Sequence, residues 1–336
     1  MMEFFANYGL FLAKTTTIVF FIVAVIILIA SLAQKKTSED DHIEIKNLGK
    51  KFANMKQLMQ ASVLTKKELK AFKKECKQAN KKVDDKKNNK RVFVLNFVGN
   101  IKATEVKHLR KEITALLTIA TAQDEVVVCL DNAGGLVHEH GLAASQLQRI
   151  RQRQIPLTVA VDRVAASGGY MMACVADHIV AAPFSVVGSI GVIAQMPNFN
   201  KLLEKYGIEY EQIKAGELKR TLTMFGKNTD EDRSHFTQQM QETHDLFKQF
   251  VADNRSQLDI EKVATGEHWL GTKALELNLV DELMTSDDYL LNQSEHADIY
   301  QISHRSPKSI SEKLTGHAQL AYEKVLTQWW EKKLLS

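Results

Sequence analysis

A serine followed by two glycines, Ser167-Gly168-Gly169, opens an apolar stretch that runs to Cys174. The stretch predicts a buried helix, yet glycine costs about 1 kcal/mol relative to alanine inside a helix. A position that carries this cost usually has to let another group approach closely. We interpret Ser167 as a nucleophile and expect the glycines to leave room for a substrate carbonyl. The simpler interpretation of Ser167 is a helix N-cap.

A second glycine-containing turn, residues 132–135 with the sequence Asn-Ala-Gly-Gly, follows a predicted strand at 125–131. Glycines expose backbone N–H groups without a Cβ in the way, and the start of a helix exposes more. If this turn meets the one at Ser167, their N–H groups can bind a tetrahedral oxyanion, which is worth about 3–4 kcal/mol for each donor. The alternative for these glycines is an ordinary turn.

A nucleophilic serine needs a base, and the acidic and histidine candidates fit poorly. Asp177 and His178 lie ten and eleven residues beyond Ser167 on the predicted helix, about 15 Å away. His138 and His140 have no carboxylate evidently placed to orient them. Their spacing also differs from the i, i+4 spacing of a zinc-binding helix.

Lysine is the remaining type of base. A neutral lysine accepts a proton well once burial lowers its pKa from about 10.4 toward 7–8. The segment 214–220, KAGELKR, contains Lys214, Lys219 and Arg220. The residues alone do not choose between the two lysines.

The overall composition is that of a globular protein, with 45% hydrophobic and 25% charged residues in a chain of 336. The net charge of +4 is unevenly placed, because residues 34–91 hold 18 Lys or Arg against 8 Asp or Glu. Aromatic residues are sparse in that segment, so nucleic acid is not the partner we expect.

The three cysteines, Cys76, Cys129 and Cys174, form no CxxC pair. Cys129 falls in a strand pattern and Cys174 in a helix pattern, so we expect both to be core thiols. We predict no disulfide framework, no metal site and no cofactor.

An uncharged run of about 19 residues, 15–33, follows a tail at 1–14. At 1.5 Å per residue this run nearly spans a hydrocarbon layer of about 30 Å, so we predict a transmembrane anchor. A cleaved signal peptide is the alternative, because Ser31-Leu32-Ala33 fits a small-x-small site, although the run is long for one. Lys35 and Lys36 favour a cytoplasmic location for the residues downstream of the run.

Residues 34–90 are predicted to form a basic helical stalk and linker. Apolar residues recur at spacings of three and four within 42–82, which indicates a helix with a narrow apolar seam. The basic face of this helix is solvated or touches anionic lipid headgroups. At the other end of the chain, residues 301–336 have the pattern of an amphipathic helical segment. We expect this segment to contact the membrane surface, another subunit of an oligomer, or the main domain.

Residues 91–300 are predicted to form one α/β domain, because strand and helix patterns alternate along them. We expect a parallel sheet covered by helices on both faces, with the site at the carboxyl ends of the strands. The predicted strands are 92–99, 125–131, 157–162 and 178–192, and the predicted helices are 104–120, 138–152 and 166–176.

Four stretches resemble the signal peptide peptidase A (SppA) family of serine peptidases: AASGGYMMACVAD, VVGSIGV, AGELKR and ATGEHWLGTKALELNLVDEL. They occur in the order and spacing of that family, and the resemblance covers nearly the whole chain. It implies a ClpP/crotonase-like fold and a Ser–Lys dyad with the lysine 52 positions after the serine. For Ser167 that lysine is Lys219.

The resemblance also implies roles for three further residues. Gly134 and Gly168 would donate their N–H groups to the oxyanion, and Ser189, in the motif GSIG, would orient the lysine amine. A serine at the end of a strand is the alternative for Ser189. This chain has Ala133 where the family usually has proline, so we expect a looser oxyanion site.

The expected function is a membrane-anchored serine endopeptidase that cleaves extended peptides, such as signal-peptide remnants or membrane-protein fragments. The resemblance implies a homo-oligomeric ring in which Ser167 and Lys219 come from adjacent subunits. It also favours the periplasmic side of a bacterial inner membrane. One alternative is a membrane scaffold with a decayed site. The other is a crotonase-like acyl-CoA enzyme, in which Ser167 would not react with a fluorophosphonate.

Overall fold

The chain forms two compact units, which we describe separately. In the computed structural model, residues 43–304 make up one unit, and residues 1–42 with 305–336 make up the other. The structure describes residues 2–34, 42–64, 68, 90–216, 219 and 221–305.

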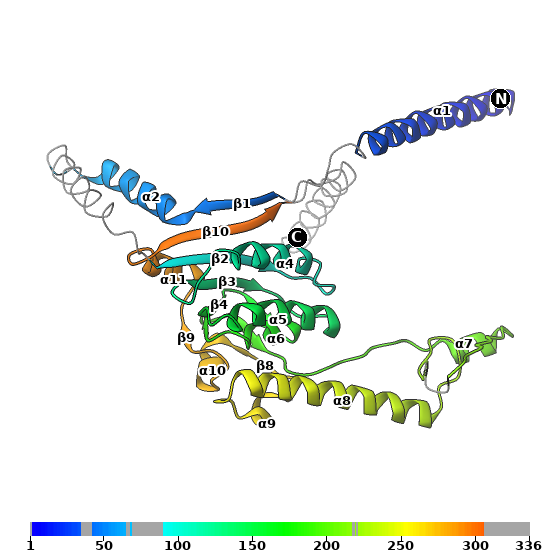
Figure 1. Cartoon of the computed structure of the whole chain (residues 1–336). Helices are drawn as coiled ribbons and strands as arrows, with labels where there is room; N and C mark the ends of the chain where they lie inside the picture. Colours follow the sequence, from blue (N-terminus) through cyan, green and yellow to red (C-terminus); the bar gives the residue numbers. More distant parts are fainter. Residues whose placement is uncertain are drawn as a thin grey trace, which may run out of the picture. The chain divides into compact units, whose positions relative to one another are not determined.

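A seven-stranded sheet in the order β1-β10-β2-β3-β4-β6-β9 runs through the larger unit (Figure 1). All the neighbouring pairs from β10 to β9 are parallel. The strands are β1 (His42–Asn47), β2 (Arg91–Val98), β3 (Glu125–Asp131), β4 (Leu157–Val161), β6 (His178–Ala181), β9 (Glu282–Leu283) and β10 (Asp298–Arg305). The predicted α/β class with a mostly parallel sheet is confirmed.

A second, three-stranded sheet has the order β5-β7-β8. Its strands are β5 (Val164–Ala166), β7 (Val186–Gly188) and β8 (His268–Leu270). The β5–β7 pair is parallel and the β7–β8 pair is antiparallel. An isolated bridge between Asn132 and Ala165 joins β5 to the end of β3, so the two sheets meet at the carboxyl edge of the larger one.

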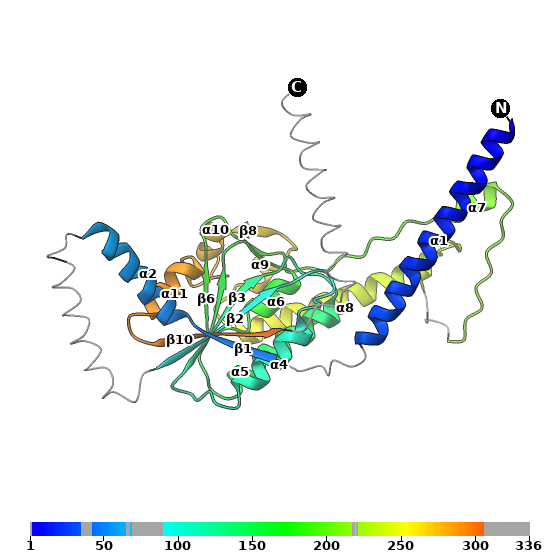
Figure 2. The ribbon, with the colours of Figure 1, turned by 90° about the horizontal axis from the view of Figure 1, so that it is seen from above.

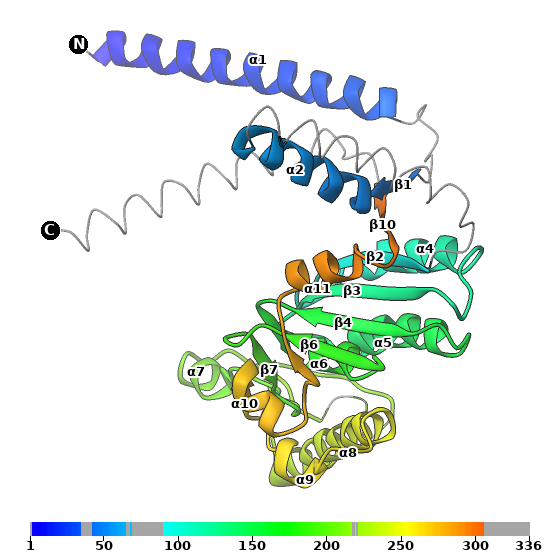
Figure 3. The ribbon, with the colours of Figure 1, turned by 90° about the vertical axis from the view of Figure 1, so that its left-hand side faces the viewer.

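Helices cover the large sheet on both faces (Figure 3). The helices of the larger unit are α2 (Leu48–Val63), α4 (Val106–Leu116), α5 (Val137–Arg151), α6 (Gly168–Ala173), α8 (Asp230–Asn254), α9 (Ile260–Val263), α10 (Gly271–Glu276) and α11 (Ser286–Gln293), with α7 (Asn200–Lys205) apart from the sheet. Side chains of α4, α5 and α6 share one large core cluster, whereas α2 and α11 pack on a smaller cluster.

The alternation of side chains along β2 explains why two clusters form. Phe93 and Leu95 belong to the larger cluster, and Val92 and Val94 belong to the smaller one. Successive residues of a strand face opposite sides, so a strand buried on both faces is apolar at every position. The sequence VFVL at residues 92–95, which is buried at every position, has this character.

Two predicted elements differ from the structure. Residues 42–47 form β1 instead of the start of a helix, because Ile43 and Ile45 alternate with polar residues and the strand pairs with β10. The helix begins only after Asn47, whose side chain caps it by accepting a hydrogen bond from Lys50 N at 2.7 Å. The predicted strand 178–192 is two strands in different sheets, because the chain turns between Ala182 and Ser185.

The ends of the chain are described only in part. Strand β10 runs to Arg305, past the predicted boundary at 300, and residues 306–336 of the predicted C-terminal segment lie outside the described residues. So does most of the predicted linker after residue 64.

Helix α1 (Met2–Gln34) includes the predicted anchor. Its apolar side chains at 18–23 are all exposed, by 47–75%. From residue 26 onward the side chains of the predicted run 15–33 lie outside the described residues. Within the described part of the chain, no helix is both long enough and apolar enough to cross a membrane, so the predicted span is not confirmed.

A long excursion between β7 and α8, residues 191–229, is called the arm here. It carries α7 away from the sheet (Figures 1 and 2). The arm folds back on itself, since Phe199 N donates to Met224 O at 2.7 Å and the rings of Phe199 and Phe225 stack with centroids 6.0 Å apart. Thr221 is the only buried residue among those described in the arm.

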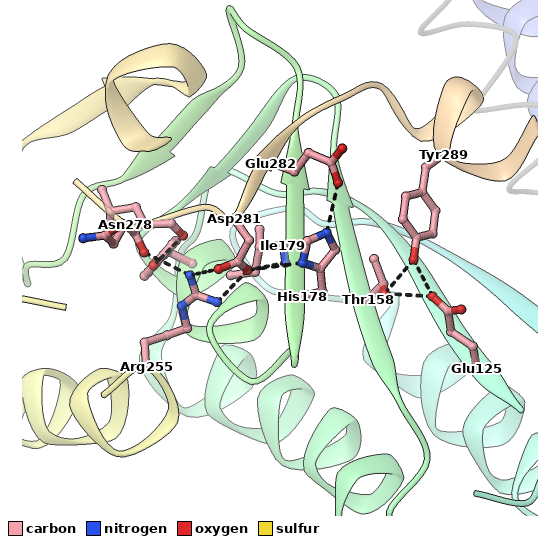
Figure 4. Close-up of polar contacts among 11 residues, drawn as sticks. Glu125, Thr158, His178, Ile179, Arg255, Asn278, Asp281, Glu282 and Tyr289 are labelled. Atoms are coloured by element: carbon pink, nitrogen blue, oxygen red, sulfur yellow. Dashed lines mark hydrogen bonds and ion pairs between the residues drawn. The ribbon is translucent and has the colours of Figure 1, made fainter. Parts of the chain in front are cut away.

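Polar side chains hold the amino-terminal edge of the large sheet together (Figure 4). Glu125 accepts hydrogen bonds from Tyr289 at 2.6 Å and from Thr158 at 2.9 Å. Arg255, 2% exposed at the end of α8, donates to both carboxylate oxygens of Asp281 at 2.8 Å. This ion pair ties α8 to the strand edge at β9.

The Arg255–Asp281 pair predicts an acid-dependent loss of stability. Burial acts to raise the pKa of the Asp281 carboxyl, but the hydrogen bonds from Arg255 and Ile179 N outweigh it and leave the pKa below its ordinary value. The pair therefore stabilises the fold above the ordinary aspartate pKa of about 3.9, and this contribution is lost as the pH falls through the lower folded-state value.

Asp281→Asn should lower the free energy of unfolding by about 3–5 kcal/mol at neutral pH, because it leaves a buried guanidinium without its counter-ion. Urea unfolding measured from neutral to acid pH checks this, and the variant should lose part of the acid dependence. Glu261→Gln is the control, since it breaks the exposed pair with Lys248 and should cost less than about 1 kcal/mol. Equal effects of the two substitutions would contradict this account.

Candidate active site

Three strand ends bring the predicted site residues into one place. Asn132 follows β3, Ser167 follows β5 and Ser189 follows β7. Asn132 N donates to Val164 O at 2.9 Å, and Ala166 N donates to Asn132 O at 3.0 Å. The register of β5 on β7 places Ala166 beside Gly188, so Ser167 and Ser189 come next on adjacent parallel strands.

Ser167 has a strained backbone, with φ 52° and ψ −120°. Its N–H donates to Gly188 O at 2.8 Å, and its carbonyl accepts from Met171 N at 2.9 Å, so both sides of the residue are fixed. Its side chain makes no capping hydrogen bond. Ser167 stands at the N-cap position of α6, but its dihedrals are not extended and its side-chain oxygen does not cap the helix, so capping does not explain the residue. The half-buried hydroxyl is held at a sharp strand-to-helix turn.

Gly134 lies directly against this turn, as the two-turn hypothesis requires. A Cβ placed on Gly134 would stand 2.7 Å from Ser167 Cβ and 2.9 Å from Gly168 N. Gly134 also has φ +92°, in the region that favours glycine. The prediction that the two glycine turns meet is confirmed.

The two glycines after Ser167 make room for protein groups, which corrects the expectation that they make room for a substrate carbonyl. A Cβ on Gly168 would stand 2.4 Å from Cγ of the His140 ring, and one on Gly169 would stand 2.0 Å from Asn132 O. His140 and Asn132 are fully buried, so these contacts are the floor of the site.

The oxyanion donors predicted from the sequence are not equally available. Gly134 N donates to Asn132 Oδ1 at 2.8 Å, so its predicted role as an oxyanion donor is not supported. Gly168 is the first residue of α6, where an N–H has no acceptor within the helix. Among the described residues, none accepts a hydrogen bond from the N–H of Gly168 or of Gly135.

Lys219 and Ser189 are not brought into contact with Ser167 by described hydrogen bonds or ion pairs. Lys219 is exposed in the arm, and its N–H donates to Gly216 O at 3.3 Å. Ser189 has φ 53°, and its N–H donates to Glu267 O at 2.6 Å. Among the described residues no hydrogen bond or ion pair joins Lys219 to Ser167, and the dyad stays a prediction.

The described cysteines are core thiols, as predicted. Cys174 is fully buried, and burial raises the pKa of its thiol far above the ordinary value. Burial also raises the pKa of Cys129 to about 11. A reactive cysteine has a lowered pKa, so neither fits the role of nucleophile. Cys76 lies outside the described residues.

Asn132 is the polar residue at this site that the sequence did not single out. Its side chain joins the Gly134 N–H and lies 3.3 Å from His140 Nε2. The available signal was an asparagine two residues before a glycine, because such side chains often bond the backbone two residues on. The contact with His140 could not be predicted, since it depends on how α5 packs against the end of β3.

The sequence matches two family models, one after the other. Residues 3–147 match "Peptidase family S49 N-terminal", and residues 149–300 match "Peptidase family S49". Ser167 and Lys219 both fall within the second match.

Curated relatives cover most of the chain. "Probable protease SohB" of Haemophilus influenzae is 43% identical over 330 residues, which is 94% of each chain. "Probable protease SohB" of Buchnera aphidicola subsp. Acyrthosiphon pisum is 53% identical over 231 residues, which is 69% of each chain. A substrate-bound mutant of the 1510-N membrane-bound stomatin-specific protease covers 68% of this chain and 98% of its own, with 16% identity and a TM-score of 0.42, too low to support any argument.

The close contact of Gly169 with Asn132 O predicts that Gly169→Ala is damaging. The new methyl group would collide with Asn132 O, so we expect a loss of about 1–3 kcal/mol in stability and a slower reaction of Ser167 with a fluorophosphonate. Gly141→Ala on α5 is the matched control, because nothing lies within 4 Å of its added Cβ. That change should raise stability by about 1 kcal/mol. Thermal unfolding measures both, and a neutral Gly169→Ala would refute the close packing.

Proposed function

The chain belongs to peptidase family S49 and is a serine protease; from this premise we propose that Ser167 is its nucleophile and Lys219 its general base. The observation that carries the proposal is the strained Ser167 turn, with a side chain that caps nothing and Gly134 packed against it. Strained residues of this kind cluster at active sites.

The proposed reaction is amide hydrolysis through an acyl-enzyme. Neutral Lys219 takes the proton of Ser167 Oγ as the oxygen attacks the substrate carbonyl. The oxyanion accepts hydrogen bonds from Gly168 N and, because Gly134 N is already bonded to Asn132, from Gly135 N. Protonated Lys219 then gives its proton to the leaving amine, and water releases the acyl group.

We propose that Lys219 acts on Ser167 of a neighbouring copy in a homo-oligomeric ring. The arm that carries Lys219 exposes ten large apolar side chains: Ile193, Met196, Phe199, Leu202, Tyr206, Ile208, Tyr210, Ile213, Met224 and Phe225. Exposed apolar surface on this scale is typical of an interaction site. An arm packed on the next subunit would bury that surface and desolvate the Lys219 amine, which favours its neutral form.

We propose membrane anchoring through α1 and a peptidase domain on the periplasmic side. Six successive apolar residues, 18–23, are exposed, so they cover every side of the helix. Water does not solvate such a helix well, whereas lipid does. The periplasmic side is proposed on the family resemblance, although Lys35 and Lys36 favour the opposite orientation.

The substrates that fit this placement are extended peptides left in or near the membrane, such as signal-peptide remnants and membrane-protein fragments. A peptidase tethered to the membrane by an anchor meets such peptides at high effective concentration. The acyl-CoA alternative loses its support, because the chain belongs to a serine protease family. A decayed scaffold would carry the same fold and assembly but would not be acylated at Ser167.

Ser167→Ala and Lys219→Ala should each lower peptide hydrolysis by at least about 10³-fold, because a nucleophile and its base act as a unit. Particles made by co-expressing the two variants with different tags should regain about a quarter of the wild-type activity, since a shared site then pairs an intact serine with an intact lysine. Full activity in either single variant would remove that residue from the mechanism. Mixed particles as inactive as their parents would place the dyad within one chain.

Deletion of residues 1–41 should release the protein from the membrane fraction after carbonate extraction, whereas the full chain should stay with the membrane. Protease added to intact spheroplasts should then digest the domain of the full chain. Release of the full chain by carbonate would contradict the anchor. Protection of the domain in spheroplasts that is lost on lysis would contradict the periplasmic placement.

A further inference from the structure

Asn132 uses its buried side chain to hold the glycine turn beside Ser167. The residue is 1% exposed. Its Oδ1 accepts from Gly134 N at 2.8 Å, and its Nδ2 faces Met172 Sδ at 3.6 Å. The Gly134 donor settles which amide atom is the oxygen, because an amide nitrogen in that place would meet another N–H group.

The backbone of Asn132 is fixed to the strand that ends in the nucleophile. Its N–H donates to Val164 O, and its carbonyl accepts from Ala166 N, the residue directly before Ser167. The hydrogen bond that this side chain accepts from Gly134 N therefore fixes the position of the turn relative to the nucleophile. Two hydrogen bonds and the side chain of Asn132 connect the turn to Ala166.

Glycines allow Asn132 to pack closely on two sides. A Cβ on Gly99 would stand 2.6 Å from Cγ of its side chain, and one on Gly169 would stand 2.0 Å from its backbone O. Asn132 as a whole is 1% exposed, so its side chain loses little further freedom when the turn binds it. Close packing of this kind keeps a hydrogen bond in one geometry.

His140 lies beside Asn132. Its Nδ1 lies 2.9 Å from Leu136 O, and its Nε2 lies 3.3 Å from Asn132 Oδ1. An amide oxygen has two lone pairs, so Oδ1 accepts from Gly134 N and contacts the His140 ring at the same time. The ring itself packs against Gly168.

The turn has a special need for such a bond, because its residue 133 is an alanine, which leaves the backbone of the turn free. Proline removes freedom from the turn through its ring, and alanine does not. Asn132 supplies the missing restraint from the preceding position, by bonding the N–H two residues on.

We infer that Asn132 is a positioning residue for the oxyanion site, and that its bond to Gly134 replaces the stiffness that a proline at position 133 would give. This inference rests on the proposed function of Ser167. It adds that the donors of the turn are preset by a side chain that never touches the substrate.

The test compares the reaction of Ser167 with a fluorophosphonate probe in wild type, Asn132→Ala, Asn132→Ser and the double variant Asn132→Ala/Ala133→Pro. The full-length protein is used, and circular dichroism confirms folding well below the thermal midpoint. We expect Asn132→Ala to lower the maximal rate of labelling by about ten- to a hundredfold with little change in the probe concentration at half-maximal rate. Asn132→Ser keeps a weaker acceptor, so its labelling rate should lie between those of wild type and Asn132→Ala.

Proline at 133 should restore most of the lost rate in the double variant. The site accepts it, since Ala133 is exposed, its φ is not positive, and no described residue accepts from its N–H. The preceding Asn132 forms a β-bridge with Ala165 of β5, and β conformation is what a residue before proline prefers. A destabilised fold would give no reason for rescue by this particular change.

Asn47→Ala is the matched control, because it removes another asparagine bond to a backbone N–H, at the start of α2. It should label at the wild-type rate. Labelling of Asn132→Ala within twofold of wild type, or no recovery in the double variant, would overturn the inference while Ser167 stays the nucleophile. Absence of labelling in wild type, or labelling that survives Ser167→Ala, would instead contradict the proposed function.

Discussion

The backbone of Ser167, held at φ 52° by hydrogen bonds on both sides, is the constraint on which the rest of the site depends. A non-glycine residue in such a conformation costs about 1–3 kcal/mol, and it persists only where the surroundings impose it. Here β5 is fixed between the end of β3 and β7, and α6 begins at once after the serine. Neither the strand nor the helix can relax the turn without losing its own pairing.

The two edges of the large sheet carry different kinds of groups. The amino-terminal edge is closed by polar groups that satisfy one another, with the Arg255–Asp281 ion pair and the hydrogen bonds of Glu125 (Figure 4). The carboxyl edge carries the strained serine, positive-φ glycines and N–H groups for which no described residue is an acceptor. Stability is thus provided at one edge while the other holds groups ready for a substrate.

The sequence predicts well those features that depend on local pattern. The strand 125–131 was expected with the bounds it has, and the meeting of the turns at 132–135 and 167–168 followed from strand direction alone. Features that depend on long-range packing were missed or wrong. The pattern of residues 42–47 predicts a helix, but pairing with β10 makes them a strand. The reason for Gly168 appears only when α5 brings His140 against it, and the reason for Gly169 appears only when the end of β3 brings Asn132 O against it. An exposed Lys219 has the same explanation in the proposed ring, since its partner lies outside the single chain.

The central proposal is that a strained serine, glycine N–H donors and a lysine from a second copy form one site. A crystal structure of the assembled protein, phosphonylated by a fluorophosphonate, tests it most directly. We predict an adduct on Ser167 Oγ whose phosphonyl oxygen accepts from Gly168 N and Gly135 N, with Lys219 of an adjacent copy in hydrogen-bond reach of the serine oxygen. A phosphonyl oxygen turned to solvent, with every Lys219 in the particle remote from the adduct, would contradict the account.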